Sequence, residues 1–366
     1  MNQISIGFMG AGGIARAHAY SLNALKFYYP EIPEISFEAV TSARKESRES
    51  FAKNFGFRHS PDMAEFIRQR NINTILILGP NEVHYEHLKL SLEMTGVKNI
   101  YLEKPVCSSR DEELRMADLL KEIPAGINIQ VGFQYLQSAA VREALKFWHT
   151  GKLGKPIHFG LKYYHGDYLQ VSYREKRRTR LTPAPDGGAM ADLGSHGISL
   201  VMAFLGENIE ILHALQAGGY SDVPMDSDLF SSLSLVDPVS LAVGTLSASR
   251  ISSGTGDLID LEIFAEKGSL RYSSQHADFF EYYLEEDQHW VRQLVGSHYK
   301  PASSFPSGHV PAGWLRAMVH AHYIFLTGRH EGSYVPGLEH GLAVQRIVRK
   351  TAEHLDEFRK NLQRDR

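Results

Sequence analysis

Short apolar runs alternate with amphipathic segments along the first third of the chain. The runs are rich in β-branched and aromatic residues and span residues 4–9, 37–40, 74–78, 100–102 and 127–131. Strand patterns that alternate with helical patterns are typical of a parallel sheet with helices on both faces. The pattern therefore predicts an α/β fold whose N-terminal domain, residues 1–131, is built on a doubly wound parallel sheet.

The pattern changes after residue 131. Strand-like segments at 157–166, 228–236, 242–250, 257–265 and 268–274 follow one another with Gly, Ser and Asp between them, and helical periodicity returns at 189–204, 314–326 and 338–358. We therefore expect a C-terminal α/β domain, residues 132–366, with a large open, mostly antiparallel sheet. One face of this sheet should lack helices of its own chain, so we expect a homodimer or homotetramer.

A glycine cluster lies between the first apolar run and the helical segment after it. Its residues are Gly10, Ala11, Gly12, Gly13, Ile14 and Ala15, a G-x-G-x-x-A pattern. The first glycine permits a tight turn, the second lets the main chain approach a pyrophosphate, and the small alanine allows close packing of helix on strand. A tight turn alone would also explain the glycines, but their place between a strand and a helix favours a Rossmann dinucleotide-binding site.

Glu103, Lys104 and Pro105 directly follow the fourth apolar run. Ser109 and Glu112 then form a capping-box pattern, which indicates the start of a helix. The two charged residues therefore lie at the carboxyl end of a buried strand. Ligands bind at this edge in open α/β sheets.

Asp192 and His196 lie four residues apart in the helical segment 189–204, and so on one face of the predicted helix. Three interpretations compete: a solvated helix face, a metal site, for which no third ligand is recognisable, and acid–base chemistry. In the last, the Asp would fix the tautomer of a His that titrates near neutral pH.

Charge and cysteine content exclude several classes of function. The formal net charge of the 366 residues is −3, which gives no case for binding nucleic acid or an anionic membrane. We interpret the short basic run at Lys176, Arg177, Arg178 and Arg180 as a solvated loop. The single cysteine, Cys107, excludes an internal disulfide framework and is more typical of a small buried hydrophobe than of a nucleophile. Without a signal-peptide pattern or a membrane-length apolar run, we expect a cytoplasmic protein.

Together with the glycine cluster, the segments "YLEKPV", "GGAMADLGSH" and "GPNEVHYEH" resemble the glucose-fructose oxidoreductase and inositol dehydrogenase family, the Gfo/Idh/MocA family. The resemblance implies a Rossmann domain followed by an open-sheet α/β domain, NAD or NADP as cofactor, and sugars, inositols or their keto forms as substrates. It implies Lys104, Asp192 and His196 as the catalytic set, and a Lys104–Pro105 bond that is often cis. The positions that it implies near the cofactor are Pro80, Asn81, His84, Glu103 and Lys104.

Some positions depart from the family pattern. Ser199 stands where many members have an acidic residue, so substrate contacts there are expected to differ, and Gly79 replaces a common Thr. His309 lies in a loop, 305–314, that loosely resembles a Gly-His-Pro loop of longer members. We interpret His309 as a surface histidine rather than a substrate contact.

The end of the second strand bears on cofactor preference. An NAD-specific site usually offers an Asp or Glu there for the ribose hydroxyls, and none is present. Thr41 and Ser42 offer hydroxyls, while Arg44 and Lys45 bring positive charge that can pair with a 2′-phosphate. This favours NADP over NAD, unless Arg44 and Lys45 merely open a solvated helix.

The sequence therefore predicts an oxidoreductase that moves a hydride between a nicotinamide cofactor and a hydroxyl or keto carbon of a sugar, inositol or related compound. Lys104 would stabilise developing alkoxide charge and His196 would carry the hydroxyl proton, while Asp192 would orient His196 or the substrate. A glycoside hydrolase that retains its cofactor and a non-catalytic dinucleotide sensor are the alternatives. We expect no metal.

Overall fold

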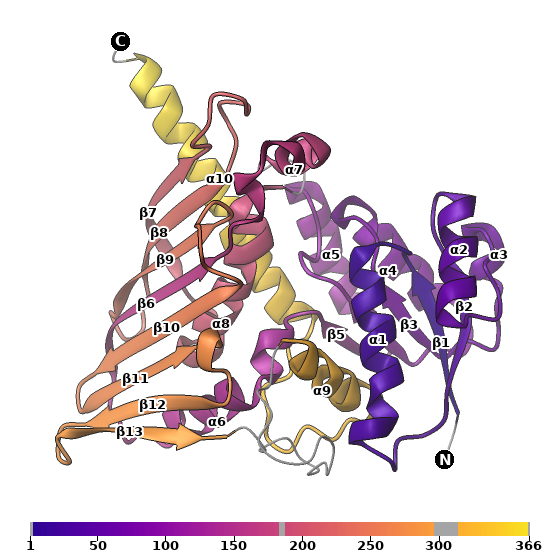
Figure 1. The fold of residues 1–366 in the computed structure, drawn as a ribbon, viewed down its shortest axis with the longest axis horizontal. Helices are drawn as coiled ribbons and strands as arrows, with labels where there is room; N and C mark the ends of the chain where they lie inside the picture. Colours follow the sequence, from indigo (N-terminus) through magenta and orange to yellow (C-terminus); the bar gives the residue numbers. More distant parts are fainter. Residues whose placement is uncertain (1–2, 183–186, 296–313, 365–366) are drawn as a thin grey trace.

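The structure, a computed structural model, describes residues 3–182, 187–295 and 314–364. Two sheets stand side by side with helices between them (Figure 1). The sequence prediction of an α/β fold with a parallel sheet first and a mostly antiparallel sheet second is confirmed. Within the described ranges, none of the helices is both long and apolar enough to cross a membrane.

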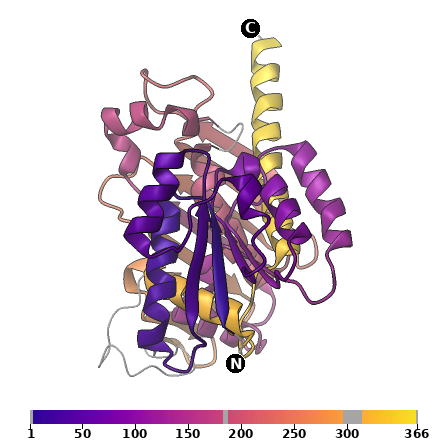
Figure 2. The ribbon, with the colours of Figure 1, turned by 90° about the vertical axis from the view of Figure 1, so that its right-hand side faces the viewer.

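The first sheet has five parallel strands in the order β2-β1-β3-β4-β5. The strands are β1 (Ile4–Met9), β2 (Ile35–Thr41), β3 (Thr74–Ile77), β4 (Asn99–Leu102) and β5 (Asn128–Val131). The helices are α1 (Gly13–Tyr28), α2 (Lys45–Phe55), α3 (Met63–Phe66), α4 (His84–Glu93) and α5 (Arg110–Glu122). Figure 2 shows helices on both sides of this sheet. The strands carry almost continuous apolar runs because both of their faces are buried.

The predicted start of α5 illustrates how local sequence sets these elements. Ser109 caps the helix, because its Oγ accepts a hydrogen bond from the main-chain N–H of Glu112 at 3.2 Å. The Glu112 carboxylate reaches back to the main-chain N–H of Ser108 at 2.8 Å, one residue further than a standard capping box requires.

The second sheet has eight strands in the order β13-β12-β11-β10-β6-β9-β8-β7, and all neighbours are antiparallel except β6 and β9. The strands are β6 (Pro156–Tyr164), β7 (Glu210–Ala217), β8 (Phe230–Val236), β9 (Val243–Ser249), β10 (Leu258–Ala265), β11 (Gly268–Ser273), β12 (Phe279–Leu284) and β13 (His289–Leu294). Its helices are α6 (Ala139–Trp148), α7 (Val171–Lys176), α8 (Ser195–Leu205), α9 (Trp314–Thr327) and α10 (Leu338–Arg364). The described helices lie on the side that faces the first sheet and leave the outer face uncovered (Figure 1).

Two helices from the end of the chain also pack on the first domain. Helix α9 lies against α1, and its Val319, Tyr323 and Phe325 share one apolar cluster with Phe8 and other residues of the first sheet. Helix α10 contacts α5 and β5. The domain boundary at 131/132 stays a prediction, because these later helices join the two parts.

Candidate active site

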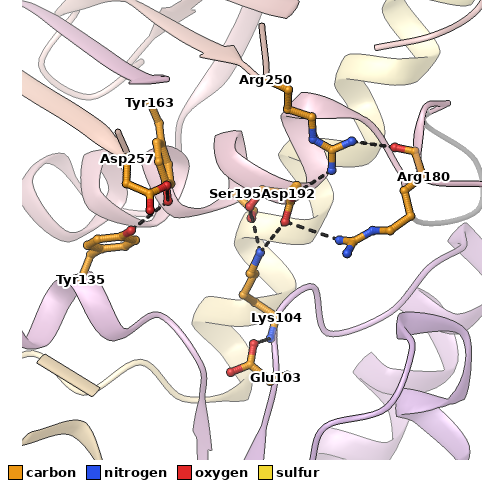
Figure 3. A network of polar contacts seen from close by, with 9 residues as sticks. All are labelled: Glu103, Lys104, Tyr135, Tyr163, Arg180, Asp192, Ser195, Arg250 and Asp257. Atoms are coloured by element: carbon orange, nitrogen blue, oxygen red, sulfur yellow. Dashed lines mark hydrogen bonds and ion pairs between the residues drawn. The ribbon is translucent and has the colours of Figure 1, made fainter. Parts of the chain in front are cut away.

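An ion pair between Lys104 and Asp192 forms the centre of the candidate site (Figure 3). Lys104 follows β4 at the carboxyl edge of the first sheet, and Asp192 lies in a π-helical turn just before α8. The Lys104 Nζ donates to the main-chain oxygen of Asp192 at 2.8 Å and to its Oδ1 at 3.1 Å. The side chains keep 14% and 23% of their surface exposed, so both remain open to a small ligand.

Two arginines complete the contacts of Asp192. The Nη2 of Arg250 donates to Oδ2 at 2.7 Å, and the Nη2 of Arg180 lies 3.5 Å from Oδ1. Burial alone would raise the pKa of Asp192, but Lys104, Arg250 and Arg180 hold that pKa well below its ordinary value. Asp192 is therefore a carboxylate at neutral pH, and its charge is shared among three cations.

His196 lies in the first turn of α8 and is buried among aromatic rings. The rings of Phe133, Tyr135 and Tyr163 surround it, with centroids 5.9, 5.0 and 6.0 Å away. Burial and the nearby charge of Lys104 hold the pKa of His196 well below 6.5, although Asp192 acts in the opposite direction. The imidazole is therefore neutral at physiological pH and able to accept a proton.

The structure corrects two expectations about this pair. The solvated helix face is wrong, because His196 is only 5% exposed. No hydrogen bond between Asp192 and His196 occurs among the described residues, and the buried Nδ1 of His196 has no partner there. The physical reason is that the Asp192 carboxylate is turned toward Lys104 and Arg250.

A π-helical turn, rather than the expected continuous α-helix over 189–204, presents Asp192. The turn spans Met190–Gly194 and continues into α8. Turns of this kind occur often at functional sites. Asp228 anchors its start, because its Oδ2 accepts from the Met190 N–H at 2.9 Å. Gly188 has φ +92°, and a Cβ there would lie 2.5 Å from the Asp228 Oδ2, so a larger residue does not fit.

Glu103 and His84 fix the main chain around Lys104. The Glu103 Oε1 lies 2.8 Å from the His18 Nε2, and its Oε2 accepts from the Lys104 N–H at 3.2 Å. The ring nitrogens of His84 lie 2.8 Å from the Pro105 carbonyl and 3.1 Å from the Gly79 carbonyl. Both side chains are buried and bond within the protein, and the cofactor contact expected of Glu103 and His84 stays a prediction. The Lys104–Pro105 bond is cis, as the resemblance implied.

The glycine cluster fits a dinucleotide phosphate. Gly10 has φ +138°, and a Cβ on it would lie 2.5 Å from the main chain of Leu78, so the turn needs glycine. Helix α1 begins at Gly13, and its N-cap, Gly12, makes no side-chain capping bond. A Cβ on Gly12 or Gly13 would meet nothing within 4 Å. Free N–H groups and open space therefore meet at a helix N-terminus, which is the arrangement that binds phosphate.

The other expected cofactor positions lie along the same edge. Ala11 and Ile14 are half-buried beside the glycines, and the exposed Pro80 and half-buried Asn81 follow β3. Ser42 and Arg44 follow β2, where Arg44 is exposed at the N-cap of α2. The one acidic residue of β2, Glu38, is buried and bonded to Arg58 and Asn71 at 2.9 and 2.8 Å, so it is not free to bind a ribose.

Comparisons with known proteins agree with this geometry. Residues 4–133 match a model described as an oxidoreductase family with an NAD-binding Rossmann fold, and residues 141–271 match the GFO/IDH/MocA C-terminal domain. The chain belongs to the Gfo/Idh/MocA oxidoreductase family. Its first domain is the NAD-binding Rossmann domain of that family.

Curated relatives of this Gfo/Idh/MocA chain carry dehydrogenase names. Levoglucosan dehydrogenase of Pseudarthrobacter phenanthrenivorans is 24% identical over 95% of both chains. The scyllo-inositol 2-dehydrogenase (NAD(+)) of Bacillus subtilis is 26% identical over 74% of this chain and 73% of its own. A levoglucosan dehydrogenase solved with NADH and levoglucosan has a TM-score of 0.85 at 22% identity, covering 97% of this chain and 98% of that one. That likeness supports the fold.

Arg250 and the tyrosine pair Tyr135–Tyr163 are residues of the site that sequence reasoning missed. The two phenol oxygens lie 2.8 Å apart, and Tyr163 donates to Asp257 at 3.2 Å (Figure 3). None of these residues stands in a local motif, so only the folded chain brings them to His196 or Asp192. Arg180, which was assigned to a solvated basic run, also reaches the site.

Three other expectations concern residues near the family motifs. Ser199 is buried and its Oγ lies 2.8 Å from the His340 Nε2, so it faces the protein interior rather than a substrate. Cys107 is buried, and burial raises the pKa of its thiol, as fits a small buried hydrophobe. His309 lies outside the described residues.

Proposed function

We propose that this Gfo/Idh/MocA protein is a nicotinamide-dependent dehydrogenase or reductase that acts on a sugar, an inositol or a related polyhydroxy compound. The observation that carries the proposal is the Lys104–Asp192 pair, with the neutral His196 beside it, at the same sheet edge as the glycine cluster. The dehydrogenase names of its relatives support this class of reaction. The comparisons give no support to the hydrolase and sensor alternatives.

Each residue of the proposed set has a distinct chemical role. An ammonium has three N–H donors, and Asp192 takes two from Lys104, which leaves one for the reacting oxygen of the substrate. That donor stabilises alkoxide charge as the carbon is oxidised. The neutral His196 accepts the hydroxyl proton and returns it in the reverse direction. A bound nicotinamide supplies the hydride acceptor or donor.

A cofactor-reduction screen tests the proposal. The purified protein is incubated with NAD or NADP and a panel of inositols, aldoses and anhydrosugars, and absorbance of the reduced nicotinamide is followed. We expect net formation of NADH or NADPH with at least one polyhydroxy compound. Glycoside cleavage without net cofactor reduction would replace the proposal with the hydrolase alternative. Dinucleotide binding without turnover across the panel would favour the sensor.

We propose further that Arg44 favours NADP over NAD. The proposal is supported by the exposed Arg44 at the end of β2 and by the absence of a free carboxylate on that strand. Arg44→Ala should weaken NADP binding more than NAD binding, by about 1–3 kcal/mol, the range for losing a hydrogen bond to a charged group. Titration of both cofactors against both proteins measures this difference. Tighter NAD binding by the wild type, or equal losses in the variant, would refute it.

A further inference from the structure

Arg250 is the bulkiest of the fully buried side chains in the described part of the protein, and it lies at the candidate reaction centre. It directly follows β9. Its Nη2 donates to the Asp192 Oδ2 at 2.7 Å, and its Nη1 donates to the main-chain oxygen of Arg180 at 2.6 Å. The guanidinium carbon also lies 4.6 Å from the centroid of the Tyr168 ring. A planar group held at three places has a fixed orientation.

The fixed guanidinium sets the direction of the Asp192 carboxylate. Arg250 takes Oδ2, while Lys104 and Arg180 lie 3.1 and 3.5 Å from Oδ1. Because both oxygens are engaged by cations on different elements, the carboxylate cannot turn toward His196. The Arg250 contact is the shortest of the three, and its donor is the one that is fully buried.

Burial makes Arg250 and Asp192 dependent on each other. A guanidinium without contact to water needs a counter-charge, because leaving it unpaired is costly. Among the described residues, Asp192 is the carboxylate that forms an ion pair with Arg250. Without Arg250, Asp192 would keep only the longer contacts with Lys104 and Arg180, whose side chains are 14% and 39% exposed.

From these contacts we propose that Arg250 is a positioning residue that holds the Asp192 carboxylate in the orientation in which its Oδ1 contacts the Lys104 ammonium. The remaining N–H of Lys104 is thereby directed at the reacting oxygen. The inference rests on the proposed function for the role of Lys104. Arg250 acts only through Asp192, because its own side chain has no exposed surface with which to touch a substrate.

Kinetics of R250M and R250K test the inference with a substrate found in the screen. In R250M the kcat should fall about 100-fold, the usual effect of misplacing a catalytic group by about 1 Å, while the dissociation constant for the dinucleotide stays unchanged. R250K keeps the positive charge that R250M removes, but it lacks the planar guanidinium. The kcat of R250K should therefore lie between those of R250M and the wild type. A wild-type kcat in R250M overturns the inference. If R250M does not fold, R250K decides: a reduced kcat with normal dinucleotide binding supports the inference, and a wild-type kcat overturns it.

A matched control and a structural readout separate this inference from the proposed function. Arg142 is also buried, but it bonds Ser333 and His320 away from the site, so R142M should leave kcat unchanged. An equal loss of kcat in R142M would mean that the loss in R250M reflects the removal of a buried arginine in general and not the contact with Asp192. A crystal structure of R250M, or of R250K if R250M does not fold, needs no substrate. A reoriented Asp192 carboxylate supports the inference, and an unchanged one overturns it, even if the screen finds no turnover.

Discussion

Lys104 and His196 are each suited to one kind of chemistry, Lys104 because of its contacts and His196 because of its burial. Lys104 has two donors engaged by Asp192 and offers only a further donor. His196 has no ion-pair partner among the described residues, and burial holds its pKa well below 6.5, so it offers an acceptor. In the proposed reaction, Lys104 would therefore stabilise negative charge and His196 would carry the proton.

Replacing either residue should remove most of the turnover while leaving the dinucleotide bound. We expect K104M and His196→Gln to lower kcat by about two to four orders of magnitude, the span for lost electrostatic or acid–base assistance. Lys121→Met is the matched control, because Lys121 pairs with Asp118 at 2.8 Å on the exposed surface of α5. Steady-state kinetics and dinucleotide titration measure the two effects. Near-normal turnover in either site variant would remove that residue from the mechanism.

Only part of this site can be derived from the sequence. Lys104, Asp192 and His196 stand in recognisable motifs, and strand–helix alternation places Lys104 at a sheet edge. Arg250 has no such signal, because it pairs with a residue 58 positions earlier and follows an ordinary strand. The role of Glu103 was also missed, since its partner, His18, lies 85 positions away.

Strands are predicted correctly from the sequence where both of their faces are buried, or where buried and exposed side chains alternate strictly. The predicted strand limits of the first sheet lie within two residues of β1 to β5. The edge strands β7 and β13, and β12 beside β13, were not predicted as strands, because they bury few or none of their side chains and so show little apolar alternation. The π-helical turn at Met190–Gly194 was also missed, since its residues fit an α-helix equally well.

Gly188 and Gly206, which flank the π-helical turn and α8, provide a test of how the turn is held. Both have positive φ, +92° and +100°, but a Cβ on Gly188 would meet Asp228 at 2.5 Å, whereas one on Gly206 would meet nothing within 4 Å. Each change to Ala should cost about 1–3 kcal/mol of stability for backbone strain. Gly188→Ala should cost more because of the clash, and should also lower kcat. Denaturant unfolding and kinetics check this, and equal effects of the two changes would contradict it.

The uncovered face of the second sheet suggests how whole molecules assemble. This face has a concavity of about 540 Å³ lined by polar and charged residues, among them Lys162, Asp260, Arg271, Glu281 and Arg292. The concavity shares no lining residue with the Lys104–Asp192–His196 site. We propose that a second copy of the chain covers this concavity. The result would be a homodimer or homotetramer whose interface is held by hydrogen bonds and ion pairs.

Charge reversal in the concavity tests this assembly. Glu281 joins Arg271 and Arg292 at 2.9 and 3.0 Å, so Glu281→Lys would gather three cations there and should dissociate the oligomer. Glu86→Lys makes the same change at an exposed pair with Arg115 on the first domain and serves as the control. Light scattering at micromolar concentration reports the mass. A monomeric wild type, or an unchanged mass in Glu281→Lys, would count against the proposal.

Buried neutral histidines should make the folded protein sensitive to acid. Burial lowers the pKa of His87 and of His340 from 6.5 to about 4. Burial also lowers the pKa values of His84, His165, His196, His320 and His322. Between pH 6.5 and about 4 the unfolded chain therefore binds more protons than the folded one, so stability is full above pH 6.5 and is lost as the pH falls.

Each such histidine should add up to about 1.4 kcal/mol per pH unit to the slope of unfolding free energy against pH. Urea unfolding at several pH values between 4.5 and 8 measures the slope. His87→Gln should lower this slope by up to about 1.4 kcal/mol per pH unit, the contribution of one proton. Carboxylates such as Asp192 change stability only at lower pH, since their ordinary pKa is 3.8. A constant stability from pH 6.5 to 4.5 would contradict the prediction.

The packing of α9 on the first sheet has a consequence for synthesis of the protein on the ribosome. Val319, Tyr323 and Phe325 close an apolar cluster whose other members, such as Phe8 and Leu76, are made near the start of translation. At ~5–20 residues per second, α9 emerges roughly 10–40 s after the first sheet is complete. During that interval the nascent Rossmann domain lacks the α9 side chains that complete this apolar cluster, so its final folding must wait until α9 has been made.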